Sequence, residues 1–480
     1  MANPTNRTSG NYQILNVLGQ GCFGKVVECF KRDTKETVAV KILKRRNSLR
    51  SNLREVFILE KLKCLDLDKS NIIKCLQWFC RRGRTFMVFE KLDMSLDKYM
   101  SQRDWVPMPF NGIRIVIRDV ATALAALKGL GLIHTDLKPD NILLVDHRTQ
   151  PFRVKVIDFG LSIERSKALH NICVQPICYR SPEVILGLSF TESIDVWSLG
   201  LVMAELLLGV ILFPGANEYD TLRFIVDLLG ELPKRLLNVG INTGEFYHGS
   251  RQCLMFLGWR LMTQKEFQAA TGIETSDNRC YQFSSLDELK TFSLSPHQTN
   301  SADAADREAC VELLKKMLQM EPRTRITPNN ILAHPFIARS SGNSCLNETV
   351  AAGTSWSPAI SNKDTAEPNA DHSPLAVQNN MTNPPPMAED DRDHILGTVN
   401  NISYDTGLVL ESISDPVNTG SFVDWDSVEE LDSSSSTNSS HVIEVCVPER
   451  IEKNKGVRGF FPTLMGIIFC FFCVSVDTDE

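Results

Sequence analysis

The chain has 480 residues, of which 43% are apolar and 23% are charged, and these proportions are ordinary for a globular protein. Its length suits two or three domains, and its net charge of −7 at pH 7 argues against direct nucleic-acid binding. The single C-x-x-C pair, Cys470 and Cys473, has no second pair with which to complete a zinc site. We therefore expect free thiols in a reducing compartment, and the polar residues 1–10 give no sign of a signal peptide.

The first apolar stretch begins at Tyr12 and runs into a glycine-rich pattern that contains Gly19, Gly21 and Gly24. The same pattern occurs at dinucleotide-binding sites, where a helix follows the glycines. Here residues 26–30, Val-Val-Glu-Cys-Phe, favour a second strand instead. We therefore expect a hairpin whose backbone N–H groups approach phosphate oxygens closely.

Lys41 is a single lysine in the apolar strand pattern of residues 37–43. A lone lysine in a strand is usually a solvent-facing residue, but its spacing after the glycines suits a lysine that contacts the α- and β-phosphates of a nucleotide. Such a lysine needs a carboxylate partner, and the helical pattern of residues 53–62 offers Glu55 and Glu60. We favour Glu55, because the apolar positions of the helix then surround it; otherwise either glutamate lies on a solvated helix face.

Two more strands are expected at residues 72–79 and 85–89, which gives the N-terminal part five strands. From Leu96 onward helical patterns dominate, most clearly over residues 113–130. The sequence therefore predicts an α+β fold with a strand-rich lobe followed by a mostly helical lobe.

The densest chemistry lies in the short stretch 133–141, which contains Asp136, Lys138 and Asn141. These residue types at this spacing are typical of a phosphoryl-transfer site. The aspartate accepts a proton from an attacking hydroxyl, the lysine neutralises charge on the γ-phosphate, and the asparagine binds a magnesium ion. A bare D-x-K is more often a polar loop before a helix, but here the partner motifs occur in the expected order on both sides.

A hairpin formed by residues 141–145 and 154–157 is expected to end at Asp158-Phe159-Gly160. Asp158 is the second candidate magnesium ligand, and Phe159 is expected to pack against the helix that carries Glu55. Further along the chain, we expect Glu183 to form a structural ion pair with Arg325. A strongly apolar helix that starts near Asp195 is expected to be buried in the helical lobe.

Taken in order, these motifs resemble those of the eukaryotic protein kinases over residues 12–336, with an N-lobe at about 12–90 and a C-lobe at about 93–336. Lys138 is typical of serine/threonine kinases, because tyrosine kinases place alanine and arginine in this loop. Within that family the chain resembles the homeodomain-interacting protein kinases, which belong to the dual-specificity tyrosine-regulated kinase group. The segments that carry this closer resemblance are 88–90, 184–188, 214–220, 271–273 and the long insert at about 234–297.

The resemblance implies a protein serine/threonine kinase that uses ATP and Mg²⁺, acts on protein substrates, and serves signalling or transcription regulation. It implies catalytic roles for Asp136, Lys138, Lys41 and Glu55, and metal binding by Asn141 and Asp158. The implied ATP-binding residues are Leu18, Gly19, Gly21, Gly24, Val26, Ala39, Lys41, Phe89, Glu90, Leu92 and Leu143. The alternative is a pseudokinase scaffold that binds nucleotide and partners without turnover.

The segment after Asp158 departs from this family. Where the family carries an autophosphorylated tyrosine and a phosphate-binding arginine, this chain has Cys173 and Ile177. Thr135 also replaces the basic residue that many kinases place before the catalytic aspartate to bind a phosphate on this segment. We therefore predict that the enzyme is not switched by phosphorylation of a tyrosine in this segment.

The ends of the chain are compositionally different from the middle. We expect disorder at residues 1–11 and in the acidic, Ser/Asn-rich tail at 340–455. Residues 442–445 weakly resemble a SUMO-interacting strand, and the alternative is a chance apolar tetrad. The uncharged stretch 459–476 is a candidate C-terminal transmembrane helix, preceded by basic residues that would keep the kinase in the cytosol.

These features leave several locations and partners open. We expect a cytoplasmic or nuclear protein, with a membrane tether if 459–476 spans a bilayer. The tail is a candidate contact for SUMO or for transcription regulators. A membrane-tethered interaction protein that uses its acidic tail is compatible with either an active kinase or a scaffold.

Overall fold

The computed structural model describes residues 8–9, 12–21, 24–43, 49–81, 84–253, 256–292 and 301–338. All of these residues belong to one compact unit, and the fold below is the fold of that unit.

Three expectations for the C-terminal region lie outside the described residues. They are the disordered tail at 340–455, the strand motif at 442–445 and the candidate transmembrane helix at 459–476. Among the helices that the structure does describe, none is both long enough and apolar enough to cross a membrane.

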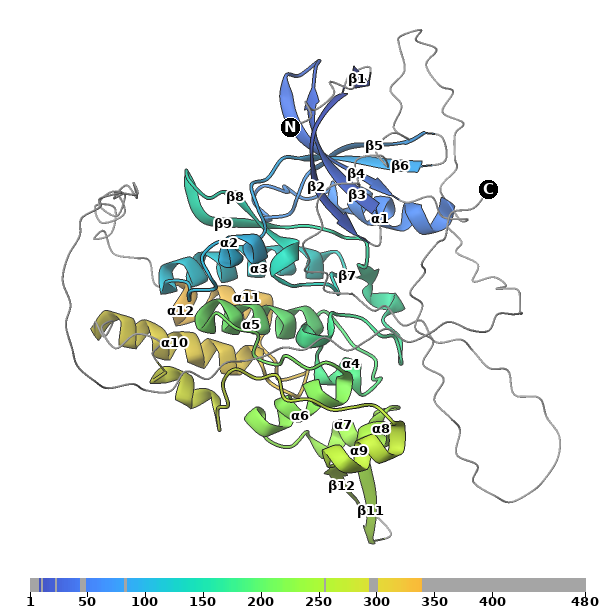
Figure 1. Ribbon diagram of the computed structural model, residues 1–480, viewed down its shortest axis with the longest axis vertical. Coiled ribbons are helices and arrows are strands. Elements are labelled where there is room, and N and C mark those ends of the chain that lie inside the picture. Colours follow the sequence, from blue (N-terminus) through green and yellow to red (C-terminus); the bar gives the residue numbers. More distant parts are fainter. Residues whose placement is uncertain are drawn as a thin grey trace, which may run out of the picture. The chain divides into compact units, whose positions relative to one another are not determined.

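The N-terminal part is an antiparallel sheet of six strands, in the order β1-β2-β3-β4-β6-β5 (Figure 1). The strands are β1 (Thr8–Ser9), β2 (Tyr12–Gly21), β3 (Gly24–Lys31), β4 (Glu36–Leu43), β5 (Cys75–Arg81) and β6 (Arg84–Glu90). The five strands expected from the sequence are confirmed. The expectation of disorder over residues 1–11 is wrong for Thr8 and Ser9, because these two residues pair with β2 and form β1 at the edge of the sheet. Strand β5 begins at Cys75 rather than at Ile72, because Ile72 is fully buried and bridges Val156 of another strand instead.

Helix α1 (Leu49–Leu62) packs against this sheet through one apolar face. Val56, Leu59 and Leu62 recur at three-residue spacing, and all three are buried in one cluster with Met87 of β6. Burying side chains of this size stabilises the contact by roughly 1.5–3 kcal/mol each. Because residues four apart share a helix face, Glu55 is carried on the side of α1 that also holds Leu59.

The C-terminal part is mostly helical (Figure 1). Its helices are α2 (Leu96–Ser101), α3 (Phe110–Gly129), α4 (Pro182–Ile185), α5 (Ser193–Leu208), α6 (Glu218–Leu229), α7 (Lys234–Val239), α8 (Thr243–Phe246), α9 (Gln264–Thr271), α10 (Ser301–Met317), α11 (Pro328–Leu332) and α12 (Pro335–Ala338). Helix α5 is buried along nearly its whole length, as its apolar sequence predicts, and it packs against α3 and α10. It ends at Gly209, whose φ is 72° and where a Cβ would lie 2.0 Å from the Trp105 carbonyl oxygen, so a larger residue does not fit.

Three short two-stranded sheets complete the fold. Their strands are β7 (Leu132–Ile133), β8 (Ile142–Asp146), β9 (Gln150–Val156), β10 (Ile163–Glu164), β11 (Tyr247–Cys253) and β12 (Phe256–Leu261). The β8–β9 hairpin confirms the predicted hairpin before Asp158. The β7–β10 pair joins the segment before Asp136 to the segment after Asp158, so these two functional segments are held side by side.

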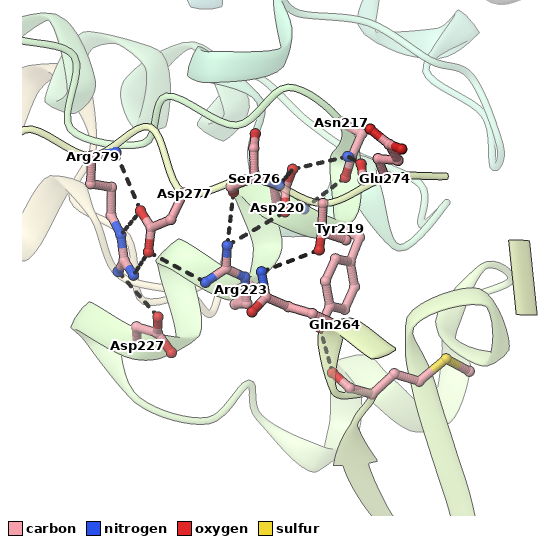
Figure 2. Close-up of polar contacts among 12 residues, drawn as sticks. Asn217, Tyr219, Asp220, Arg223, Asp227, Gln264, Glu274, Ser276, Asp277 and Arg279 are labelled. Carbon is pink, nitrogen blue, oxygen red and sulfur yellow. Dashed lines mark hydrogen bonds and ion pairs between the residues drawn. The ribbon is translucent and has the colours of Figure 1, made fainter. Parts of the chain in front are cut away.

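The insert after α6 is structured where it is described, and its last part is bonded back to α6 (Figure 2). Arg223 of α6 donates to the Ser276 carbonyl oxygen at 2.9 Å. Asp277 accepts three hydrogen bonds from Arg279, one from its backbone N–H and two from its side chain, and the Arg279 side chain also binds Asp227 of α6 at 3.1 Å. These contacts hold the chain after α9 against α6.

The predicted ion pair between Glu183 and Arg325 is confirmed. Arg325 donates from Nη1 and Nη2 to the two Glu183 carboxylate oxygens at 2.6 and 3.0 Å. Both side chains are essentially excluded from solvent, and the guanidinium lies 5.1 Å from the centre of the Trp197 ring. The pair therefore fixes α4 to the segment before α11, and to α5 through the tryptophan.

Candidate active site

Lys41 lies at the centre of a compact charged cluster. Its Nζ donates to both Glu55 oxygens at 2.8 and 2.9 Å and to Asp158 Oδ1 at 2.8 Å. Glu60, the other glutamate considered from the sequence, is exposed and instead accepts from Trp78 Nε1 at 2.9 Å. The structure thus brings together the lysine of β4, the favoured glutamate of α1 and the aspartate after β9.

Lys41 and Asp158 stabilise each other's charge, whereas burial raises the pKa of the Glu55 carboxyl despite the opposing charge of Lys41. Burial alone would lower the pKa of Lys41, but the adjacent carboxylates of Asp158 and Glu55 outweigh burial and raise its pKa above the ordinary lysine value. Burial opposes ionisation of Asp158 as well, yet Lys41 holds the pKa of this carboxyl below its ordinary value. The lysine therefore stays a cation, and Asp158 stays an anion, at neutral pH.

Asp136 and Asn141 form a second buried pair. Asn141 Nδ2 donates to the Asp136 carbonyl oxygen at 2.8 Å and to Asp136 Oδ2 at 2.7 Å. The other carboxylate oxygen, Asp136 Oδ1, is buried and has no hydrogen-bond partner among the described residues. Burial raises the pKa of Asp136, and the charge of Lys138 opposes that rise. An orphaned carboxylate oxygen of this kind is an acceptor available to a ligand hydroxyl.

The backbone around Asp136 is held by α5. Asp195 Oδ2 accepts the His134 backbone N–H at 2.8 Å, and Asp195 Oδ1 accepts the Thr135 N–H at 2.9 Å. Thr135 has a φ of 68°, an uncommon conformation for a β-branched residue, and the hydrogen bonds to Asp195 help to hold the backbone in this strained conformation. The His134 ring also lies 2.9 Å, through Nε2, from the Ile157 carbonyl oxygen, next to Asp158.

Sequence reasoning named Asp195 only as the start of a helix and gave His134 no role. The available signal was one acidic residue in the first turn of an otherwise strongly apolar helix, since a buried carboxylate requires donors. Lys138, which was predicted, is buried and immediately precedes the 3₁₀ turn Pro139–Asn141. The turn carries Asn141 back towards Asp136.

The oxygen atoms in this region fit a magnesium ion. Asn141 Nδ2 is committed to Asp136, which leaves its Oδ1 as an acceptor, and Asp158 supplies an ionised carboxylate. Among the described residues no group of three or more histidines, cysteines, aspartates and glutamates forms a metal cluster. Magnesium is ordinarily bound through one or two carboxylates together with substrate phosphates and water, so this sparse oxygen set suits it.

The three glycines of the β2–β3 hairpin have different surroundings, and only one of these positions requires glycine for the fold. Gly24 has a φ of 155°, and a Cβ there would lie 2.1 Å from the Ile42 carbonyl oxygen, so the close approach of β3 to β4 requires glycine. At Gly19 and Gly21 a Cβ would meet nothing within 4 Å. The fold itself therefore leaves the backbone of these two residues uncovered.

The predicted ATP-binding side chains are distributed over neighbouring strands. Val26 of β3 lies opposite Lys41 of β4, and Ala39 of β4 lies opposite Phe89 of β6. The remaining positions are placed as follows: Leu18 is 46% exposed on β2, Glu90 ends β6, Leu92 is buried just after it, and Leu143 lies on β8. The register thus aligns the β3, β4 and β6 members of the set across the sheet.

The segment that departs from the family is anchored by buried polar contacts. Thr135 Oγ1 donates to the Leu161 carbonyl oxygen at 2.8 Å, so this residue ties the loop to the segment after Asp158. The Tyr179 hydroxyl is buried and donates to Glu205 Oε2 at 2.6 Å. Burial raises the pKa of the Glu205 carboxyl to about 7. Tyr179 is thus a core residue, in keeping with a packing role.

Comparison with known proteins identifies the family. Residues 12–337 match the family described as "Protein kinase domain". The chain is 44% identical to homeodomain-interacting protein kinase 2 of Mesocricetus auratus over 333 residues, which cover 68% of this chain and 28% of that protein. It is 44% identical to homeodomain-interacting protein kinase 1 of Mus musculus over 336 residues, covering 69% of this chain and 28% of the relative.

A third relative, homeodomain-interacting protein kinase 4 of Homo sapiens, is 39% identical over 341 residues, covering 68% of this chain and 55% of that protein. The alignments therefore span between about a quarter and about half of the lengths of these relatives. The match to the family covers most of the residues that the structure describes, including the Lys41 cluster and the pair formed by Asp136 and Asn141. The chain belongs to the protein kinase family, and its kinase domain is similar to those of the homeodomain-interacting protein kinases.

Proposed function

We propose that this chain is a protein serine/threonine kinase that transfers the γ-phosphate of ATP to hydroxyl groups of protein substrates. The observation that carries the proposal is the pair of buried clusters. One holds Lys41 between Glu55 and Asp158, and the other leaves Asp136 Oδ1 as an unpartnered acceptor beside Asn141. A kinase needs these groups for positioning and charge stabilisation, which supply most of the rate in phosphoryl transfer.

In this proposal Asp136 Oδ1 accepts the proton of the substrate hydroxyl as the hydroxyl oxygen bonds to the γ-phosphorus. The bond from that phosphorus to the β–γ bridging oxygen breaks, and ADP leaves. Lys138 stabilises negative charge on the transferred group. Asn141 and Asp158 would hold Mg²⁺, which when bound neutralises charge on the β- and γ-phosphates.

We assign nucleotide binding to the strand-rich lobe at about residues 12–90. Lys41, held by Glu55, pairs with the α- and β-phosphates, and the backbone of the hairpin that contains Gly19, Gly21 and Gly24 covers these phosphates. The backbone of Glu90 and Leu92 bonds the adenine. The remaining predicted side chains contact the base or close the space behind it: Leu18, Val26, Ala39, Phe89 and Leu143. The helical lobe, at about 93–336, supplies the catalytic loop.

We also propose that activity needs no phosphotyrosine in the segment after Asp158. This segment is already bonded to α1, because Arg54 donates to the Ser162 carbonyl oxygen at 3.3 Å and Lys61 pairs with Glu164.

The pseudokinase alternative gains no specific support, because every residue that the proposed chemistry uses is present.

The proposed location is the cytoplasm, the nucleus or both. The SUMO contact at 442–445 and the membrane tether at 459–476 are proposed from sequence alone. Extraction of the full chain from membranes by alkaline carbonate would exclude the tether. Loss of SUMO binding when the apolar residues of 442–445 are replaced by alanine would support the contact, and the absence of SUMO binding by the wild type would exclude it.

Transfer of radiolabelled phosphate from ATP to myelin basic protein by the full chain tests the proposed activity. We expect wild type to transfer phosphate, and we expect Lys41→Met and Asp158→Asn to abolish transfer. Lys128→Met, a surface lysine that pairs with Glu192, is the matched control and should retain activity. If wild type binds nucleotide in a thermal-shift assay but transfers no phosphate, the chain is a scaffold and the proposal is wrong.

A further inference from the structure

Lys155 is a buried lysine that the proposed chemistry does not use. It lies in β9, three residues before Asp158, and its side chain is 2% exposed. Its Nζ donates to the two Glu90 carboxylate oxygens at 2.7 and 2.9 Å and to Asp68 Oδ1 at 2.8 Å. A buried ammonium group is costly unless it is paired, so these carboxylates account for its presence in the core.

Glu90, the last residue of β6, is held through both its side chain and its backbone. Its carboxylate accepts the Lys74 backbone N–H at 2.8 Å, and its own N–H donates to the Lys74 carbonyl oxygen at 3.1 Å. Lys74 also pairs through its side chain with Asp68, and the hydrogen bonds from Lys155 and Lys74 lower the pKa of Asp68 to about 2. Lys155 is therefore the cation shared by the end of β6 and the segment before β5.

Strand β9 is tied to the same segment by its backbone. Val156 N–H donates to the Asn71 carbonyl oxygen at 2.9 Å, and Ile73 N–H donates to the Val156 carbonyl oxygen at 3.1 Å. Lys155 also lies opposite Leu143 of β8 in the hairpin register. These bonds fix the strand that leads into Asp158, and the Lys155 side chain connects this strand to Glu90.

We propose that Lys155 is a positioning residue for the adenine nucleotide, because its side chain fixes the end of β6 relative to β9, the strand that leads into Asp158. The inference rests on the proposed function, in which the backbone of Glu90 bonds the base and Asp158 binds the phosphates through a metal. Replacing Lys155 by methionine removes the bonds to Glu90 while largely keeping the length of the side chain. We expect nucleotide affinity to fall about tenfold, the effect of losing a charged hydrogen bond.

If the ion pair between Lys155 and Glu90 were merely structural, its loss would lower the stability of the protein without changing the affinity for nucleotide. Lys74→Met is the matched control, because the Lys74 side chain hydrogen-bonds to the same Asp68, whereas its ammonium group is only attracted electrostatically to Glu90 and no side-chain hydrogen bond joins the two among the described residues. The Lys74 backbone N–H, which does bond Glu90, is unchanged by this substitution. We expect Lys74→Met to bind nucleotide within about twofold of wild type.

The experiment measures dissociation constants of ADP without Mg²⁺ and of a fluorescent ATP analogue with Mg²⁺, on the full chain, with melting temperatures recorded in parallel. Glu90→Gln and the double variant Lys155→Met/Glu90→Gln complete a cycle. Because both substitutions remove the attraction between the Lys155 ammonium group and the Glu90 carboxylate, we expect each single variant to weaken ADP binding similarly and the double variant to be no weaker than either. The protein-substrate KM should not change.

Two results would overturn the inference alone. One is equal ADP affinity for wild type, Lys155→Met and Lys74→Met, whatever their melting temperatures. The other is a double variant whose loss is the product of the two single losses. If wild type binds no nucleotide, both this inference and the proposed function are wrong. If Lys155→Met does not fold, Glu90→Gln still decides, because it keeps the acceptor for the Lys74 N–H while weakening the bond to Lys155: unchanged ADP affinity would refute the inference.

Discussion

Glu205 provides the sharpest test of the electrostatics of the helical lobe. Glu205 as a residue is 2% exposed, and its carboxylate accepts a hydrogen bond from the Tyr179 hydroxyl at 2.6 Å. Burial raises its pKa from 4.5 to about 7, whereas the unfolded chain should titrate near the ordinary value. The folded protein therefore binds a proton that the unfolded protein releases between about pH 4.5 and pH 7.

This difference makes Glu205 increasingly destabilising as the pH rises. Below about pH 4.5 the Glu205 carboxyl is protonated in both states and does not change the free energy of unfolding. Above about pH 7 its full destabilising effect on the folded state is present. A rise from 4.5 to about 7, at about 1.4 kcal/mol per pKa unit, corresponds to about 3 kcal/mol. Glu205→Gln removes the titration but keeps an oxygen that accepts from Tyr179.

We expect Glu205→Gln to raise the free energy of unfolding at pH 8 by about 2 kcal/mol, because an unpaired amide N–H offsets about 1 kcal/mol of the gain. At pH 5 the two proteins should differ by less than about 1 kcal/mol. Urea unfolding of wild type and variant at both pH values measures the difference. A variant that is destabilised as much at pH 8 as at pH 5 would refute the reasoning.

Three further predictions concern single contacts. Arg325→Met should lower stability by about 3–5 kcal/mol, because it leaves the Glu183 carboxylate buried and unpaired, and replacing both partners by methionine should cost less in the same urea titration. Gly24→Ala should lower the melting temperature by several degrees, since its Cβ would overlap the β4 backbone, while Gly21→Ala should leave it within about one degree. Phosphopeptide mapping of active protein should find no stoichiometric phosphate on Tyr179, because its hydroxyl is buried and bonded.

Each of these has a clear contrary result. A double variant as unstable as Arg325→Met alone would show that packing, rather than the orphaned charge, sets the cost at that site. Equal melting temperatures for the two glycine variants would contradict the distinction between a glycine needed by the fold and one left open. Stoichiometric phosphotyrosine at Tyr179 would show that the segment opens and is switched after all.

Local patterns in the sequence were enough to predict much of the sheet and its chemistry. Alternating and apolar runs predicted five strands, and helical spacing selected Glu55, rather than Glu60, as the partner of Lys41. The hairpin before Asp158 was predicted because a strand, a turn and a second strand are all local signals. The start of β5 was wrong by three residues, since a tertiary bridge to β9 draws Ile72 inward.

Most of the parts that could not be predicted from the sequence depend on contacts between distant segments. Asp195 bonds the backbone around Thr135 from 60 residues away. Lys155 reads as an ordinary strand lysine until the fold brings it to Glu90, which lies 65 residues earlier in the chain. A buried polar residue has no periodic pattern of its own, because its partners are determined by tertiary packing. The two-residue strand β1 likewise offers too few residues for any pattern.

The orphaned oxygen of Asp136 gives the most direct test of the account. Steady-state kinetics of Asp136→Asn in the full chain, with ATP and myelin basic protein, compare a carboxylate with an amide that has the same shape but accepts no proton. The account predicts that kcat falls by about 10²–10⁴-fold, the usual contribution of a general base, while the dissociation constant for the fluorescent ATP analogue stays within about twofold. A kcat close to that of wild type would contradict the assignment of Asp136 as the base and, with it, the central claim.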